Sequence, residues 1–261
     1  MRRLKTRLLS LCLALSLTGA AEAAKIYALK YGESTYKASL VNTLAKSRLV
    51  RLNWLFYVIE TGAPAQYTLI DTGFSAAEQR RRFGLTRYNA AESLLQSIGL
   101  KPEMISRVIL THTHFDHAGN LALFPRARIT LHAAEYEALS DRRTAAFLAA
   151  AKSQGLLDII TASRSQLGDF EIIHTGGHTP GSIAIQWRAP KNTFVFTGDE
   201  CYFAAACRAG IPLPKASAFS VARNTEFIRA LNPQHVLLTG HETEPLGGKW
   251  INDNVYLIEA D

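Results

Sequence analysis

Short runs of apolar and β-branched residues recur along the chain and alternate with stretches of helical periodicity. Runs of this kind are typical of buried strands. They predict strands at 54–60, 67–70, 107–110, 128–131, 171–174, 183–187, 193–196 and 236–238.

The segments between these runs place apolar residues at the spacing of one helix face. In the last of them the apolar positions are Val221, Phe227, Ile228 and Leu231. Helices are predicted at 76–83, 90–98, 133–139, 144–154 and 220–231. Because each sheet and each helix must bury an apolar face, this order predicts an α/β (α+β) fold in which helices cover mixed sheets.

The first residues have the pattern of a secretory signal peptide. Four basic residues between positions 2 and 7 precede the apolar run 8–17, and Ala21-Glu22-Ala23 forms an A-x-A cleavage site. We expect cleavage after Ala23, export to the periplasm or the medium, and no stable membrane anchor afterwards. An uncleaved anchor is the alternative, although the apolar run is shorter than the span of about 20 residues that a membrane requires.

The remaining residues, 24–261, are predicted to form a single domain, since no repeat, low-complexity tract or flexible linker interrupts them. Removal of residues 1–23 takes away four basic residues and Glu22, so the formal net charge falls from +7 to +4. This charge gives little electrostatic support for a nucleic-acid partner, and a small-molecule substrate is expected instead. Only Cys201 and Cys207 remain outside the signal peptide, and both a disulfide and two free thiols are left open.

Residues with metal-binding side chains follow several predicted strands. Asp71 comes after the run ending at 70, His112 after the run ending at 110, and Asp199 and His241 after the runs ending at 196 and 238. Side chains gathered at strand ends can converge on one site.

The segment Thr-His-Thr-His-Phe-Asp-His at 111–117 carries three imidazoles and one carboxylate. In extended backbone His112 and His114 point the same way, so both can reach one ion. Asp116 and His117 lie at the turn into a helix-like stretch, 119–124, and can serve a second ion. This ligand set suits zinc, and iron, manganese and cobalt are alternatives.

Three further positions have settings that favour ligand roles. His178 lies in the glycine-rich turn 176–181, and Asp199 and His241 each follow a Thr-Gly pair at a strand end. A single histidine is more often a packed or surface residue than a ligand, and this is the prediction for His132, His174 and His235.

In this order the motifs resemble those of the metallo-β-lactamase superfamily, over residues 71–241. The resemblance implies a four-layer αβ/βα sandwich, and it implies that Asp71 supports the metal site from outside the ligand set. The ligands that it implies are His112, His114 and His178 for one ion, Asp116, His117 and His241 for the other, and Asp199 as the bridge between them.

Two divalent ions, expected to be zinc, would make hydrolysis by a metal-bridging hydroxide the natural chemistry. True β-lactamases of the superfamily generally lack an aspartate where Asp199 stands, and flavodiiron proteins have glutamate where His114 stands. Glyoxalase II enzymes carry an additional helical region, and ribonuclease Z-like enzymes need a nucleic-acid surface. These subgroups are therefore disfavoured.

The closest subgroup is the N-acyl-homoserine-lactone lactonases, because Asp199-Glu200-Cys201-Tyr202 matches their D-x-x-Y pattern. The resemblance implies that Tyr202 hydrogen-bonds the lactone carbonyl or the developing oxyanion, with a packed aromatic as the alternative. Asp116 is expected to assist protonation of the leaving alkoxide. Hydrolysis of another ester, thioester, phosphoester or β-lactam remains an alternative, as does a non-catalytic exported zinc-binding protein.

Several apolar residues near the predicted site are candidates for holding an acyl tail, with core packing as the alternative for the first two: Trp54, Phe56, Phe203, Ile211, Leu213 and Phe219. The segment 203–219 is predicted to be a loop beside the site. No conformation follows from the sequence for the polar segment 31–49.

Overall fold

The computed structural model describes residues 24–62, 65–245 and 247–260, and the predicted signal peptide lies outside them. Within these ranges no helix is long and apolar enough to cross a membrane.

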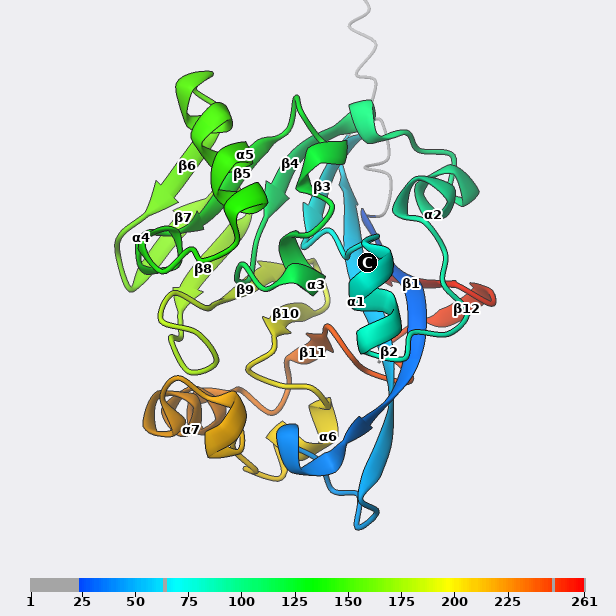
Figure 1. Ribbon diagram of the computed structural model, residues 1–261, viewed down its shortest axis with the longest axis vertical. Helices are drawn as coiled ribbons and strands as arrows, with labels where there is room; N and C mark the ends of the chain where they lie inside the picture. The colour runs from blue at the N-terminus through cyan, green and yellow to red at the C-terminus, as the bar shows by residue number, and fades with distance from the viewer. Residues whose placement is uncertain (1–23, 63–64, 246, 261) are drawn as a thin grey trace, which may run out of the picture.

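Two mixed sheets form the centre of the molecule (Figure 1). The first has the order β12-β13-β1-β2-β3-β4-β5-β6, and the second has the order β11-β10-β9-β8-β7. The strands of the first sheet are β1 (Ala24–Lys37), β2 (Leu49–Thr61), β3 (Gln66–Ile70), β4 (Ile105–Ile109), β5 (Arg128–His132), β6 (Leu157–Ile160), β12 (Lys249–Asn252) and β13 (Val255–Ala260). Those of the second are β7 (Arg164–Leu167), β8 (Phe170–His174), β9 (Ile183–Arg188), β10 (Thr193–Gly198) and β11 (Val236–Thr239).

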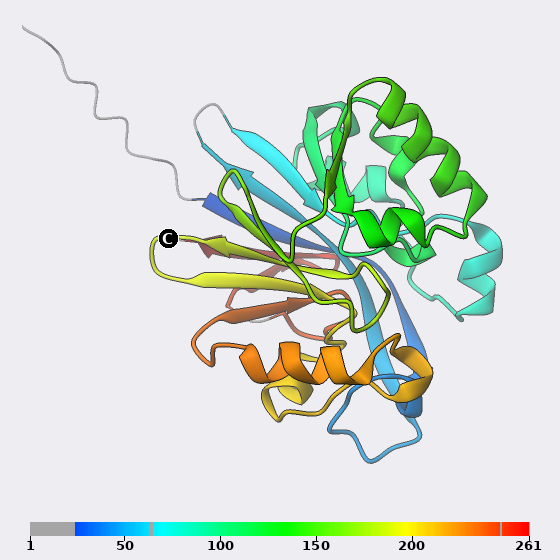
Figure 2. The same ribbon diagram turned by 90° about the vertical axis from the view of Figure 1, so that its left-hand side faces the viewer.

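Helices lie on the two outer faces of this pair of sheets, and Figure 2 shows the green helices and α7 on opposite sides. The helices are α1 (Ala77–Arg82), α2 (Ala91–Ser97), α3 (Phe115–Ala118), α4 (Ala133–Glu137), α5 (Arg142–Ser153), α6 (Ala204–Arg208) and α7 (Val221–Ala230). Short 3-10 turns are η1 (Ala38–Leu40), η2 (Pro102–Met104), η3 (Leu121–Leu123) and η4 (Lys215–Ser217).

The alternation of side chains along a strand explains why the layers stack in this order. In β2, Phe56 and Val58 pack against the outer helices with Leu95 and Leu148, while Tyr57 and Ile59 face the second sheet. In the second sheet, Phe194 and Phe196 face the first sheet, and Val195 packs outward with Ile228 of α7. Both sheets are therefore apolar on both faces, and the predicted four-layer αβ/βα sandwich is confirmed.

All the predicted strands are present, but β1, β6, β7, β12 and β13 were not predicted. Residues 31–37 of the unassigned polar segment belong to β1. Lys30 and Ser34 are buried there, because β1 lies between β2 and β13. Polar residues inside a central strand hide the alternation by which a strand is recognised.

Two local predictions are wrong. The segment 203–219 is not a loop throughout, since it contains α6 and η4. Its alanine-rich start favours a helix, and Ala204, Ala206 and Cys207 are buried there. The stretch 119–124 contains only the short turn η3, and α3 precedes it, so Asp116 and His117 lie inside a helical turn and not before one.

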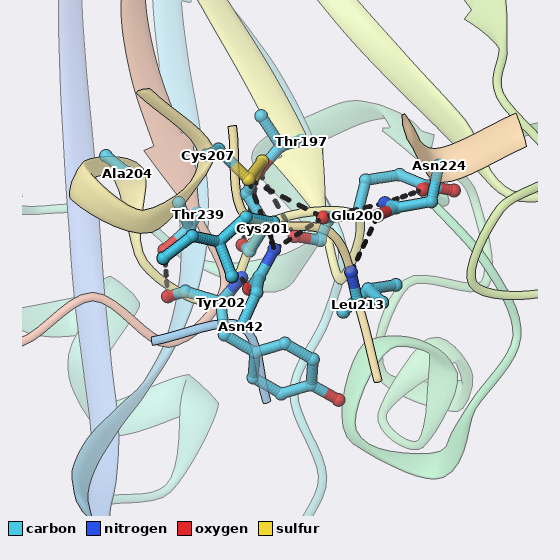
Figure 3. The surroundings of a disulfide bond; sticks show 12 residues. Asn42, Thr197, Glu200, Cys201, Tyr202, Ala204, Cys207, Leu213, Asn224 and Thr239 are labelled. Carbon is cyan, nitrogen blue, oxygen red and sulfur yellow. Dashed lines mark hydrogen bonds between the residues drawn. A yellow bond between two sulfur atoms is a disulfide. The ribbon is translucent and has the colours of Figure 1, made fainter. Parts of the chain in front are cut away.

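The structure pairs Cys201 with Cys207, which sequence reasoning had left open (Figure 3). Both residues are buried, and their Cα atoms lie 5.9 Å apart. The bond joins the turn after β10 to α6. Closing so short a loop constrains the unfolded chain by about 2 kcal/mol in the chain-entropy model.

Candidate metal centre

The seven predicted ligands converge where the two sheets meet. His112 follows β4, Asp199 follows β10, His241 follows β11, and His178 lies in the turn between β8 and β9. Backbone hydrogen bonds join the two sheets beside these residues, from Ile183 N to Thr111 O and from Leu55 N to Gly240 O, each 2.9 Å long. The ligands of the two sheets are thus held in a fixed relation to each other.

One group of donor atoms comes from His112, His114, His178 and Asp199. The Nδ1 atom of His114 lies 3.0 Å from Nε2 of His112 and 3.0 Å from Nε2 of His178. The Oδ2 atom of Asp199 lies 3.4 Å from Nε2 of His178. These four atoms surround one point, as the resemblance implied for the first ion.

The second group comes from Asp116, His117, His241 and again Asp199. The Oδ1 atom of Asp199 lies 3.1 Å from Nε2 of His117 and 3.3 Å from Nε2 of His241. The Oδ2 atom of Asp116 lies 3.4 and 3.5 Å from the same two nitrogens. Asp199 therefore presents one oxygen to each group, which is the geometry of a bridging carboxylate.

These residues fit divalent metal ions by two observations. Ligand atoms about 2.0–2.1 Å from a tetrahedral zinc ion lie about 3.3 Å from one another, which matches the distances in both groups. In addition, Nε2 of His117 and Oδ1 of Asp199 are buried and have no hydrogen-bond partner among the described residues. Buried polar atoms without a partner destabilise a fold, and a cation between these two would remove that cost.

The histidines of the two groups differ in pKa: the values of His112 and His114 are lowered, and those of His117 and His241 are raised. Burial and the neighbouring histidines His117, His114 and His178 hold the pKa of His112 well below its usual value, and burial and His178 lower the pKa of His114. Neutral imidazoles of this kind are the form that binds a metal.

Burial would lower the pKa of His241 as well, but the carboxylates of Asp199 and Asp116 outweigh it and raise the pKa to about 9. The pKa of His117 is raised well above its usual value for the same reason. The two buried carboxylates thus favour the protonated form of these histidines. A bound divalent ion would replace those protons as the positive charge in this group.

The other ring nitrogens of the ligand histidines are held by contacts outside the ligand set. Nδ1 of His117 lies 2.7 Å from Oδ2 of Asp71, Nδ1 of His178 lies 2.8 Å from the Ser217 carbonyl oxygen, and Nδ1 of His241 lies 3.2 Å from the Asn53 carbonyl oxygen. A carbonyl oxygen only accepts, so Nδ1 must donate, and Nε2 is left free for a metal. Of these partners only Asp71 was predicted.

Asp71 is fixed from both sides. It accepts from Thr111 N and Thr111 Oγ1, each at 2.8 Å, as well as contacting His117. Its backbone has φ 62°, a conformation that residues other than glycine adopt uncommonly. The carboxylate is therefore a rigid support for His117.

The Asp71→Asn variant is expected to bind the ion of the second group about 10- to 100-fold more weakly, since the amide cannot reproduce both oxygen contacts. Competition with a coloured chelator measures this affinity. Asp158→Asn is a matched control, because Asp158 lies in β6 and pairs with Arg107 and Arg128. Unchanged affinity in Asp71→Asn would show that Asp71 does not support the metal site.

Ligands of both groups line a cavity of about 440 Å³, namely His114, His178, Asp116, His241 and Asp199. Tyr202 lies in its wall, stacked on His241 with ring centroids 4.9 Å apart. Burial and the charge of Asp199 raise the pKa of Tyr202 well above its usual value, so the phenol keeps its proton and can donate it in a hydrogen bond. Tyr202 is thus both packed and aimed at the site, and the two alternatives for it are compatible.

Only some of the residues predicted to hold an acyl tail line this cavity. Trp54 and Phe219 line the cavity, and Phe219 is 62% exposed. Phe56 and Leu213 are buried in core clusters, and Phe203 and Ile211 are not among the lining residues. The cavity wall also contains apolar residues that were not predicted, namely Tyr36, Leu52, Phe83 and Phe115.

The three histidines that were predicted not to be ligands lie outside both groups. The rings of His132 and His174 stack at 3.6 Å, and Nδ1 of His132 accepts from Ala134 N at the start of α4. Two buried glutamates beside the ligands, Glu135 and Glu200, were not predicted. A charged residue directly after Asp199, in an otherwise apolar segment, was the signal that could have revealed Glu200.

Comparisons with known proteins agree with this geometry. The family model described as the metallo-beta-lactamase superfamily matches residues 55–241. An N-acyl homoserine lactonase of Bacillus cereus is 27% identical over 240 residues, which cover 84% of this chain and 94% of that protein.

Among solved structures, an N-acyl homoserine lactone hydrolase with the product N-hexanoyl-L-homoserine at its catalytic metal centre has a TM-score of 0.67 and 20% identity, and the match covers 85% of this chain and 94% of that one. A probable metal-dependent hydrolase from Staphylococcus aureus has a TM-score of 0.69 and 18% identity, with 90% and 97% covered. At such identities these two structures establish the fold.

Proposed function

The chain belongs to the metallo-β-lactamase superfamily, and we propose that it is a two-metal hydrolase that opens the lactone ring of N-acyl homoserine lactones. The observation that carries the proposal is the cavity that ligands of both groups line together with Tyr202 and several aromatic side chains. The names of the relatives that align over 84% of the chain support the same substrate.

We propose two zinc ions as the cofactor: His112, His114 and His178 would hold one ion, Asp116, His117 and His241 would hold the other, and Asp199 would offer one oxygen to each. When bound, such ions lower the pKa of a water molecule and polarise the carbonyl group that is attacked.

The side chains of the protein have three tasks in this reaction. The Tyr202 phenol donates a hydrogen bond to the carbonyl oxygen as negative charge develops on it. The Asp116 carboxylate takes the proton of the attacking water and delivers it to the ring oxygen when the ester C–O bond breaks. The product is an acyl-homoserine, whose acyl tail lies against Trp54 and Phe115.

We also propose that residues 1–23 direct export and that the mature chain acts in the periplasm or the medium. The signal-peptide pattern supports this, and so does the buried disulfide between Cys201 and Cys207, since disulfides persist in oxidising compartments.

The Tyr202→Phe variant is expected to lower kcat about 10- to 100-fold on lactones with its metal content unchanged, because the oxyanion loses one donor while the ions remain. Tyr136→Phe, on the outer helix α4, is the matched control. Full activity in Tyr202→Phe would remove the phenol from the mechanism.

The substrate assignment is tested by proton release from a panel of compounds. N-acyl homoserine lactones with short and long acyl chains are compared with a β-lactam, a thioester and a phosphoester. Turnover is expected with the lactones. If another member of the panel is hydrolysed and the lactones are not, the substrate proposal is wrong while the metal site stands. If a chain with two ions bound hydrolyses none, the proposal of an enzyme gives way to that of a zinc-binding protein.

A further inference from the structure

A carboxylate with no assigned role, Glu200, is fully buried directly after the bridging ligand Asp199. Its Oε1 atom accepts hydrogen bonds from the backbone N–H groups of Gly177 and His178, each at 2.9 Å. The hydroxyls of Thr175 and Ser182 donate to the same oxygen at 2.8 and 2.6 Å. Four donors from the turn that carries His178 thus converge on one oxygen atom.

The second oxygen, Oε2, accepts from Nδ2 of Asn224 at 2.6 Å. In all these contacts the Glu200 oxygens are acceptors, and no lysine or arginine pairs with them within the described residues. A polar side chain is costly to bury, and it is retained in a core only where hydrogen bonds satisfy it. A side chain that served only to fill this space would be apolar.

The turn that carries His178 is shaped around this carboxylate. A Cβ atom at Gly177 would lie 2.2 Å from Oε2 of Glu200 and 2.8 Å from the Asn224 Cα atom. Only glycine lets the backbone approach so closely, so the second glycine of the Gly-Gly-His turn has a specific purpose.

Glu200 is itself held firmly (Figure 3). Its carbonyl oxygen accepts from Nδ2 of Asn42 at 3.2 Å and from Nδ2 of Asn224 at 3.0 Å. Oδ1 of Asn224 in turn accepts from Leu213 N, and Oδ1 of Asn42 accepts from Tyr202 N. The disulfide of Cys201 closes the same segment. The position of the Glu200 carboxylate is therefore fixed, and its hydrogen bonds hold the neighbouring turn that carries His178.

The geometry points to Glu200 as a positioning residue for His178: it holds this ligand in register with Asp199, and it thereby sets the affinity of the first metal group. This inference rests on the proposed metal function. The second group is supported elsewhere, since Asp71 holds His117 and the Asn53 carbonyl oxygen holds His241. The loss of Glu200 should therefore weaken the binding of the ion in the first group and leave the binding of the other ion unchanged.

The test is a zinc titration of the metal-stripped full chain, with calorimetry and chelator competition resolving the two affinities. Glu200→Ala removes every contact of the carboxylate and is expected to lower the affinity of one ion by about 100-fold. Glu200→Gln keeps one acceptor oxygen, and about a tenfold loss at the same ion is expected. If the alanine variant does not fold, the glutamine variant alone decides.

Two reference variants separate positioning from general stability. Ile172→Ala opens a cavity in the core between the sheets, and both zinc affinities should be unchanged. Asp71→Asn should weaken the binding of the ion in the second group. Its effect on the binding free energy should therefore add to that of Glu200→Gln in the double variant. Equal weakening of both ions in Glu200→Gln, or no weakening, would overturn the inference.

A failure of the proposed function is distinguishable from a failure of this inference. The former appears in the wild-type chain, as fewer than two bound ions or no turnover of lactones. The latter appears only in the comparison of the variants. Two ions without lactone turnover in the wild type would leave the zinc titration fully informative.

Discussion

The Asp199→Ala variant is expected to lose most of its bound metal and to hydrolyse lactones at less than about 1% of the wild-type rate. Asp199 gives one carboxylate oxygen to each group of donor atoms, so its removal leaves both groups one ligand short. The substitution would also remove a negative charge that offsets the positive charge of the bound ions. Elemental analysis and proton-release kinetics on the same sample measure the two effects.

Asp253→Ala is the matched control for this variant, because Asp253 is exposed in the turn between β12 and β13. It should keep two ions and full turnover. An Asp199→Ala protein that still held two ions would show that the carboxylate is not the bridge, and one that kept its turnover would show that the reaction occurs elsewhere.

Removal of the metal ions is expected to destabilise the fold strongly. Without ions, Asp116 and Asp199 remain buried among the five ligand histidines, and Nε2 of His117 has no hydrogen-bond partner within the described residues. A ligand that binds only the folded state stabilises it by about 4 kcal/mol per site when its free concentration is a thousand times its Kd. Denaturant unfolding with excess zinc and with EDTA measures the difference.

The Asp199→Ala protein serves as the control here, since its unfolding midpoint should respond little to zinc. Equal midpoints of the wild-type protein in zinc and in EDTA would contradict tight binding to the folded state. Binding of zinc to the unfolded chain would reduce the difference but would not abolish it.

The ligands could be recognised in the sequence because some directly follow strands and others cluster in one short segment, and the resemblance to the superfamily divided them between two ions. The strands that carry His112, Asp199 and His241 are apolar on both faces and are therefore easy to recognise. The histidines at 112 and 114 share a direction in extended backbone, and the structure places their ring nitrogens 3.0 Å apart. Periodicity and residue type were sufficient for these features.

The contacts that hold the ligands in place could be predicted much less well. His178 and His241 are oriented by the carbonyl oxygens of Ser217 and Asn53, and every residue has such an oxygen. Their positions depend on how η4 and β2 pack in three dimensions. Glu200 is a visible side chain, but its role depends on the close approach of Gly177, which no pattern in the sequence encodes.

Strand β1 of the first sheet was missed for a different reason. Strand β1 contains Lys30 and Ser34, which are buried yet polar, so the alternation is hidden. Lys30 is paired with Glu33 at 2.6 Å, and Ser34 accepts from the Trp54 indole at 2.8 Å. Tertiary partners allow polar residues in a central strand, and a single sequence does not reveal such partners.

Anomalous X-ray diffraction at the zinc absorption edge, on crystals of the zinc-loaded chain, tests the two-metal site most directly. Two peaks about 3.5–4 Å apart are expected, one within reach of His112, His114 and His178 and the other within reach of Asp116, His117 and His241, with Asp199 touching both. A single peak, or peaks away from these residues, would contradict the two-metal account.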